Sequence, residues 1–414
     1  MFYMVSFMYY TLNNNVYLVN GNSRGCIYDF NNAKLFSINA ALKEKIELVN
    51  NGKLQVGDLD EETNKIFKQL LELDILKISE TSCSHYITEL KDSSILTPDF
   101  AWIEITTKCN LRCKHCYNES DIYCDNIMSL DEFKLVIDKI KKIGIDKVQL
   151  IGGEPFFNKE ILNSMIEYIK DKFSFIEIFT NGTLGNEAWV QYLKKNKINV
   201  ALSIYSYDKE CHDKITGVHG SWEKTNAFIK LLKEYDVPYR VCNVLMKGLE
   251  LGEKNTSLYC LSEDRDVVRM SGRGNLSLLS DELIKKRLIT KKSFQKPIKK
   301  SFCVGALNAH NCFKNKIYIS TDLQVYPCVM ERRIKHCSIS KNEDILLDKE
   351  ILTLTKDTIK ECSICEYRYA CFDCRPNTLE GILNEKPWYC TYDPYLGKWE
   401  DPDKFISTLR AKYI

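Results

Sequence analysis

The sequence predicts an α/β protein centred on a partial barrel of six parallel β-strands, with one smaller domain on each side. Between residues 98 and 280, short apolar strands alternate with amphipathic helices, which is typical of a parallel sheet with helical crossovers. A dense group of cysteines begins at Cys303, and the first ninety residues contain their own strands and helices. We therefore divide the chain into residues 1–92, 98–280, 281–302 and 303–414.

The amino-acid composition limits the number of domains and the classes of function that the chain can have. A chain of 414 residues that is 44% hydrophobic can bury two or three cores. The net charge of +2 gives no electrostatic case for binding nucleic acid or membranes, and no run approaches the roughly 18 apolar residues of a membrane span. The start lacks the basic segment of a signal peptide, so we expect a cytoplasmic protein whose 18 cysteines bind metal rather than form disulfides.

The first domain is predicted to contain a small sheet and two helices. Strands are expected over 16–19, 26–30 and 34–37, and helices over 40–49 and 61–73. This arrangement resembles the winged-helix domain of many peptide maturases, in which a leader peptide adds as a strand to the sheet edge. The string from Tyr17 to Phe30 also resembles, in part, maturases of grasp-with-spasm peptide systems. The alternative is a cap on the barrel.

In the central domain, each expected strand is followed by a helix or a loop. The Ser129-x-x-Glu132 capping box begins a helix that ends at Gly144. Further helices are expected over 159–172, 187–195 and 222–235, the last with an N-cap at Ser221. The expected strands are 102–105, 147–151, 175–179, 199–206, 239–246 and 267–270.

Three cysteines, Cys109, Cys113 and Cys116, follow the first of these strands with C-x3-C-x2-C spacing. This spacing supplies three thiolates to one [4Fe–4S] cube and leaves the fourth iron open for a substrate or cofactor. A structural zinc knuckle is the alternative, but closed zinc sites need four ligands. His115 lies inside the triplet, where its reach to a shared metal is poor.

The triplet resembles the radical S-adenosylmethionine (radical SAM) enzymes, and other landmarks of that family follow in order. The resemblance implies a radical SAM barrel and an S-adenosylmethionine site at the carboxyl ends of its strands. The residues that it assigns to the cofactor are His115, Gly152, Gly153, Glu154, Pro155, Thr180, Asn181 and Ser203. His212 and His219 lie in a later stretch that is common in the peptide-modifying branch; a surface position is expected for both, and proton transfer is the alternative.

The C-terminal cysteines surround a predicted hairpin, 316–320 with 324–326, and continue as Cys362-x2-Cys365-x5-Cys371-x2-Cys374. This field resembles the SPASM domain, which carries two auxiliary [4Fe–4S] clusters in peptide maturases. The resemblance assigns Cys303, Cys312, Cys328 and Cys374 to the first cluster and Cys362, Cys365, Cys371 and Cys390 to the second. The family usually has three residues before the last cysteine of the block, so whether Cys374 closes the first cluster stays open. A pair of zinc sites is the alternative. Residues 281–300, rich in lysine, are expected to be a solvated linker helix and loop, and docking of an acidic peptide is the alternative.

The resemblance implies a radical SAM peptide maturase with three [4Fe–4S] clusters. It would take hydrogen from a residue of a ribosomally made precursor through a 5′-deoxyadenosyl radical and install a crosslink, most plausibly a thioether. Its partners would be that precursor and a flavodoxin- or ferredoxin-type electron donor. Formylglycine formation by a sulfatase-type maturase and peptide epimerisation are alternatives within the class. A non-catalytic metal-binding scaffold is the alternative outside it.

Overall fold

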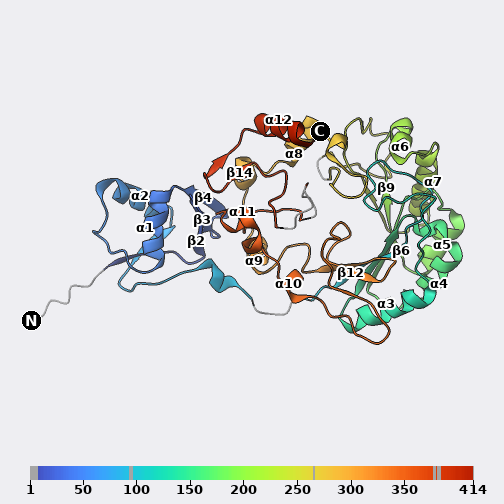
Figure 1. Ribbon diagram of the computed structural model, residues 1–414, viewed down its shortest axis with the longest axis horizontal. Helices are drawn as coiled ribbons and strands as arrows, with labels where there is room; N and C mark the ends of the chain where they lie inside the picture. Colours follow the sequence, from blue (N-terminus) through green and yellow to red (C-terminus); the bar gives the residue numbers. More distant parts are fainter. Residues whose placement is uncertain (1–7, 93–96, 264–265, 376–378, 380–383, 414) are drawn as a thin grey trace, which may run out of the picture.

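The computed structural model describes residues 8–92, 97–263, 266–375, 379 and 384–413. Its main sheet has eight strands in the order β10-β9-β8-β7-β6-β11-β12-β13 (Figure 1). The strands of the expected barrel are β6 (Phe100–Thr106), β7 (Lys147–Gly152), β8 (Phe175–Thr180), β9 (Asn199–Ser203) and β10 (Tyr239–Cys242), and all of them pair in parallel. Their carboxyl ends therefore meet at one edge of the sheet, as expected.

Helices cover the outer face of these strands. They are α3 (Leu130–Lys142), α4 (Lys159–Ile169), α5 (Glu187–Lys195), α6 (Lys209–Thr216) and α7 (Ser221–Glu234). The apolar sides of α3, α4, α5 and α7 form one core with the strands, in which Phe133, Ile166 and Phe228 are completely buried, whereas Ile215 of α6 packs in a separate core. The capping box of α3 is confirmed, because the Ser129 hydroxyl accepts from Glu132 N at 3.2 Å and the Glu132 carboxylate accepts from Ser129 N at 2.8 Å.

The barrel differs from the expected six strands at both edges. Residues 267–270 do not form a sixth strand, since only Val267 makes an isolated parallel bridge, to Leu245. Val268 instead packs in a separate core with Leu279 and Tyr389. At the opposite edge, β11 (Lys316–Ile319) pairs in parallel with β6, so the hairpin expected in the C-terminal domain extends the barrel sheet. Strand β12 (Gln324–Tyr326) pairs with β11, and β13 (Cys337–Ser338) pairs with β12.

Two local expectations were wrong. Ser221 is not the N-cap of α7, because Gly220 holds that position and the Ser221 hydroxyl bonds the Asp213 carboxylate at 2.7 Å. The lysine-rich segment has the expected helix and loop, but its apolar side chains are not solvated. It forms α8 (Asp281–Arg287), a 3₁₀ turn at Lys291–Phe294 and the start of α9 (Lys300–Asn308), and the side chains of Ile284 and Ile289 enter the core beside Tyr389. Apolar residues at helical spacing decided its burial despite the surrounding charge.

The N-terminal domain contains the expected strands and helices and one further pair of strands. A three-stranded sheet of β2 (Val16–Asn20), β3 (Gly25–Asp29) and β4 (Lys34–Ile38) carries α1 (Ala40–Asn50) and α2 (Glu61–Glu72) on one face. The additional strands, β1 (Tyr9–Leu12) and β5 (Leu76–Ser79), pair with each other across most of the domain. Their short length and distant pairing explain why the sequence pattern did not indicate them.

The other face of the small sheet packs on the C-terminal cysteine domain, which includes α10 (Lys349–Leu352), α11 (Lys360–Ser363), β14 (Tyr392–Asp393), β15 (Lys398–Trp399) and α12 (Pro402–Tyr413) (Figure 1). Tyr17, Val19, Cys26 and Tyr28 share one core with residues such as Cys303 and Tyr367 of the cysteine domain. The two ends of the chain are therefore joined through a common core. Among the described residues, no helix combines the length and apolar character needed to cross a membrane.

We predict that Tyr28→Ala destabilises both domains together. Tyr28 is completely buried, and its hydroxyl donates to Glu366 O at 3.0 Å in the cysteine domain. Truncating a buried aromatic residue of this size should cost about 3–5 kcal/mol of unfolding free energy. Chemical denaturation checks the change, with Tyr123→Ala, at an 89% exposed position, as the control expected to stay within about 0.5 kcal/mol. Loss of the N-terminal domain alone, in a separate early transition, would contradict the shared core.

Candidate functional site

Cys109, Cys113 and Cys116 lie in the loop after β6, and all three line one cavity of about 1640 Å³ at the carboxyl ends of the strands. Leu111 N donates to Cys109 Sγ at 3.4 Å, which fixes the first thiol. Burial raises the pKa of the Cys113 thiol to about 12, although the positive charge of Arg273 acts to lower it. The thiol is thus protonated in the absence of a ligand, and binding of a metal cluster would release that proton.

The Gly152–Gly153 pair at the end of β7 brings two loops into backbone contact. Gly153 N donates to Thr106 O at 2.7 Å, and Glu154 N donates to Lys108 O at 2.8 Å. A Cβ atom on either glycine would collide with the carbonyl oxygen of Thr106 or Lys108. The pair is therefore required for the strand end to reach the cysteine loop, whatever else it contacts.

The Glu154 carboxylate connects this turn to the next strand end. It accepts from the Thr180 hydroxyl at 2.6 Å, from Asn181 N at 2.7 Å and from Phe156 N at 3.0 Å. Complete burial raises its pKa to about 7, although these three donors oppose the shift. Because both oxygens are used inside the protein, Glu154 holds the site together, whereas the sequence assigned it to the cofactor. Pro155 is buried next to it, at the start of a short 3₁₀ turn.

Asn181 carries this network to the cysteine loop. Its side chain donates to Asn110 Oδ1 at 3.0 Å and lies 3.8 Å from Cys109 Sγ. Gly152, Gly153, Thr180, Asn181, Ser203 and His115 all line the same cavity as the three thiols. The structure therefore brings together the sequence-predicted residues of the cofactor site, apart from Glu154 and Pro155, which lie behind it.

Sequence reasoning missed Tyr205 and Arg273 in this site. The buried Tyr205 hydroxyl hydrogen-bonds Ser203 and Cys113, and its ring packs edge-on against His115 with centroids 4.8 Å apart. The sequence could have indicated Tyr205, because Tyr205 lies two residues after Ser203 and alternate residues of a strand share a face. Arg273 Nε donates to Cys113 O at 2.9 Å across 160 residues of sequence, so no local pattern could indicate it.

Of the two histidines of the following stretch, His219 has the expected surface position, whereas His212 does not. His212 is buried, its Nδ1 accepts from Tyr205 N at 3.2 Å, and burial lowers its pKa to about 4. The His219 side chain is 96% exposed. Neither lines the cavity of the cysteine triplet.

The predicted first auxiliary set is brought together in part. Cys312, Cys328 and Cys374 lie close enough to interact electrostatically, and Arg269 Nη1 donates to Cys374 Sγ at 2.9 Å. Cys303 lies elsewhere, in the core shared with the N-terminal sheet, where its thiol faces Cys26 and Tyr28. The short Cys371-x2-Cys374 spacing thus does not prevent Cys374 from reaching the hairpin cysteines.

This first set lies beside the cavity of the cysteine triplet. Val329 and Met330, which directly follow Cys328, line that cavity, and so does Arg269. Arg269 also donates to the Asp266 carboxylate at 2.7 Å. One side chain therefore connects the wall of the cavity to a thiol of the first auxiliary set.

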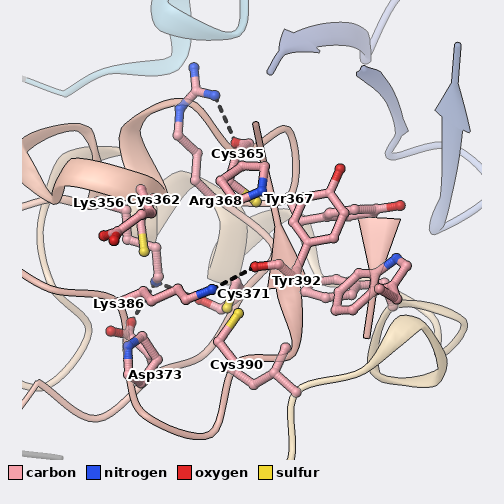
Figure 2. Close-up of a pocket in the computed structure, with 16 residues that line it drawn as sticks. Lys356, Cys362, Cys365, Tyr367, Arg368, Cys371, Asp373, Lys386, Cys390 and Tyr392 are labelled. Atoms are coloured by element: carbon pink, nitrogen blue, oxygen red, sulfur yellow. Dashed lines mark hydrogen bonds and ion pairs between the residues drawn. The ribbon is translucent and has the colours of Figure 1, made fainter. Parts of the chain in front are cut away.

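The predicted second auxiliary set is brought together completely. Cys362, Cys365, Cys371 and Cys390 line a separate cavity of about 440 Å³, and Figure 2 shows their thiols around it. Burial raises the pKa of the Cys362 thiol to about 12. Within the described residues, no three His, Cys, Asp or Glu side chains form a site for a single metal ion. Four thiols around one cavity fit a cube that binds each thiolate through a different iron.

Comparison with known proteins identifies the central domain. Residues 103–255 match the family model described as the Radical SAM superfamily. The chain is 32% identical over 178 residues to the antilisterial bacteriocin subtilosin biosynthesis protein AlbA of Bacillus subtilis, covering 42% of this chain and 40% of AlbA. It is 25% identical over 341 residues to an AdoMet-dependent heme synthase of Methanosarcina barkeri, covering 71% of this chain and 96% of that protein.

The crystal structure of Streptococcus suis SuiB bound to S-adenosylmethionine matches with a TM-score of 0.53 at 14% identity, over 89% of this chain and 96% of SuiB. This likeness extends the shared fold to both flanking domains. Residues 103–255 are therefore similar to the radical SAM superfamily, and the chain spans about two fifths of the length of AlbA, to which it is similar.

We predict that Cys303→Ala and Cys374→Ala differ in iron content after anaerobic reconstitution. Cys303 lies outside the first auxiliary set, so its loss should leave about twelve irons per chain, the content of three cubes. Cys374 lies inside the set, and its loss should remove about four. Iron and acid-labile sulfide assays measure both. Equal losses in the two variants would show that Cys303 reaches the first cluster after all.

Proposed function

We propose that this protein is a radical SAM maturase of a ribosomally made peptide. The observation that carries the proposal is the shared cavity, because residues beside the cysteine triplet and residues beside the first auxiliary set line the same space. A substrate in that space would contact both groups. AlbA, a bacteriocin biosynthesis protein by its name, supports a peptide substrate. The similarity to an AdoMet-dependent heme synthase supports S-adenosylmethionine chemistry in the barrel, but it does not indicate a peptide substrate.

Cys109, Cys113 and Cys116 would hold a [4Fe–4S] cluster, and the donor set fits, since these three thiols line one cavity and Cys124, the further cysteine of the same loop, does not line it. With S-adenosylmethionine bound, such a cluster supplies reductive cleavage of the sulfonium and a 5′-deoxyadenosyl radical. Gly152, Gly153 and Thr180 line the space for the methionine end, and Ser203 and Tyr205 lie on the adjacent strand end. Apolar side chains such as Ile151, Phe179 and Met330 exclude water from the reacting centre.

A thioether is the crosslink that the first auxiliary set favours. Three thiols without Cys303 would leave one iron of that cluster open, next to the cavity, where a substrate cysteine thiolate can bind as a soft ligand. The substrate carbon gives one hydrogen atom to the radical. Formation of the C–S bond would release one further electron, which a cluster held by Cys312, Cys328 and Cys374 would accept, and the thiol proton would leave when the substrate cysteine ionises. An external donor of the flavodoxin or ferredoxin type would restart the cycle.

The N-terminal domain, residues 1–92, would bind the leader of the precursor. Its sheet is covered on both faces, by α1 and α2 and by the cysteine domain. Strand β4 (Lys34–Ile38) is at the edge, and in the described part of the chain no backbone group bonds its outer side. A peptide strand can add there through main-chain hydrogen bonds. The shared core with the cysteine domain would connect that leader to the cluster region.

We predict that the reconstituted protein, reduced in the presence of S-adenosylmethionine and the peptide encoded beside its gene, removes two hydrogen atoms from that peptide. Intact mass separates epimerisation, which leaves the mass unchanged, and formylglycine formation from cysteine, which removes the sulfur. Formylglycine formation from serine also removes two hydrogen atoms, and alkylation of the cysteine thiol separates it, because only a thioether consumes that thiol. Replacing Cys109, Cys113 and Cys116 together with Ala should abolish 5′-deoxyadenosine formation and keep the auxiliary clusters. Reductant-dependent cleavage in that variant would show that the active cluster lies elsewhere, and no cleavage by the wild-type protein would favour a scaffold.

We also predict that the same peptide protects the amides of β4 from hydrogen exchange. Strand addition would engage the outer N–H groups of residues 34–38, whereas β3, already paired on both sides, should change little. Exchange is measured by mass spectrometry with and without the peptide, and a scrambled leader sequence is the control. Binding that leaves β4 unprotected would place the leader at another surface and favour the role of the domain as a cap.

A further inference from the structure

The segment that joins α8 to α9 carries exposed lysines with no partner inside the described part of the protein. Lys291, Lys292, Lys296 and Lys299 are all exposed. Among the described residues, no carboxylate oxygen lies within 4.0 Å of these four ammonium groups, and none of the four donates a hydrogen bond. The sequence also contains no Asp or Glu from residue 283 to residue 321, so acidic neighbours along the chain do not offset this charge.

The inner side of this segment is fixed to the N-terminal sheet. Phe294 and Ile298 are partly buried and pack against the core that contains Tyr28, as Leu35 of β4 also does. Ile298 N donates to Ala33 O at 2.9 Å, directly before the start of β4. The segment therefore holds the lysines on either side of Ile298 beside the first residue of the strand that is proposed to receive the leader.

A fifth lysine, Lys34, extends this charge onto β4 itself. It is exposed, and within the described ranges its ammonium group has no ion-pair partner. Its cross-strand neighbour Asp29 is buried, and the Asp29 carboxylate accepts from Asn31 N and Asn32 N, both at 3.0 Å, instead. We call the five residues the lysine surface: Lys34, Lys291, Lys292, Lys296 and Lys299.

Acidic residues of the neighbouring elements do not pair with the lysine surface. Glu361 lines the second cysteine cavity together with Phe294. Glu400 is exposed and follows Trp399, whose ring lies 5.8 Å from the ring of Phe294. Neither carboxylate comes within 4.0 Å of a lysine of the surface. An ionic partner for these lysines would therefore come from another molecule.

We propose that the lysine surface binds acidic side chains of the precursor's leader, at the point where the leader passes the start of β4. The inference rests on the proposed function, because it requires a leader strand on β4. Such a strand bonds main-chain groups along residues 34–38, and its continuation past Ala33 meets Ile298 and the lysines beside it. Main-chain bonds do not select a sequence, whereas charge pairs at one end would select an acidic leader and fix its register.

A peptide fits this surface better than a folded electron donor does. The lysine surface adjoins the edge of β4, which no backbone group bonds on its outer side in the described residues. Only an extended chain can use the strand edge and the lysines together. A folded protein would contact the lysines and leave the edge unused.

The test measures binding of the peptide encoded beside the gene, labelled with fluorescein, to the reconstituted protein by fluorescence anisotropy at low salt. The triple variant Lys292→Glu, Lys296→Glu and Lys299→Glu leaves the sequence of β4 unchanged. It should weaken the affinity about fivefold or more, because it replaces several attractive charge pairs by repulsive ones. A smaller change in this variant, with the iron content of the wild type, overturns the inference.

The matched control is a second triple variant, Lys224→Glu, Lys230→Glu and Lys233→Glu. These exposed lysines lie on α7, on the outer side of the barrel and far from the N-terminal sheet (Figure 1). The control changes the net charge equally and should leave the affinity within about twofold of the wild type. Equal weakening by both variants would show an effect of net charge alone and overturn the inference. Unchanged peptide affinity with lost reduction by a flavodoxin would assign the surface to the electron donor, which also overturns it.

A change in the peptide decides the case in which the charge-reversed protein does not fold. Replacing every Asp and Glu of the leader with Asn and Gln should weaken binding to the wild-type protein about fivefold or more and remove its sensitivity to about 0.5 M NaCl. Unchanged affinity, or a leader without acidic residues, overturns the inference. Hydrogen exchange separates this test from the proposed function. If the wild-type protein binds the peptide and β4 is protected, an unaffected charge-reversed variant refutes the lysine surface alone, whereas absence of binding refutes the proposed function first.

Discussion

The candidate site depends on one buried carboxylate. Glu154 accepts hydrogen bonds from Thr180 and Asn181, so the end of β7 cannot move without the end of β8. The backbone contact of Gly153 and Glu154 with Thr106 and Lys108 adds the cysteine loop to the same unit. Complete burial makes the ionised carboxylate costly, and its three donors offset that cost only while the loops stay in place. The geometry of the site and the charge of Glu154 therefore stabilise each other.

The second cysteine field is organised around cavities and buried charge. Cys312, Cys328 and Cys374 lie beside the wall of the substrate cavity, and Arg269 connects them to it. The other four cysteines enclose a cavity of their own, with Lys356 against it. Position and electrostatics thus distinguish two groups of thiols that are chemically alike.

The two ends of the chain depend on each other for stability. Tyr28 of β3 is completely buried against residues of the cysteine domain, and the buried Cys303 of α9 packs against the N-terminal sheet. A small sheet with both faces covered can bind a further strand only at an edge, and of its two edge strands, β2 and β4, β4 is the less buried. Folding of the cysteine domain, and with it the retention of any auxiliary cluster, is therefore coupled to the domain that is proposed to bind the leader.

The sequence by itself determined the parallel strands, their helices and the cysteine triplet, because periodicity and C-x3-C-x2-C spacing are local properties of the chain. It also grouped Cys362, Cys365, Cys371 and Cys390, three of which lie within ten residues. Only the tertiary structure decided where distant residues meet. It placed β11 beside β6, Cys303 beside Cys26, and Arg273 on the cysteine loop. These contacts join segments that are far apart in the sequence. They depend on how side chains pack and how charges pair, and no local sequence pattern encodes this.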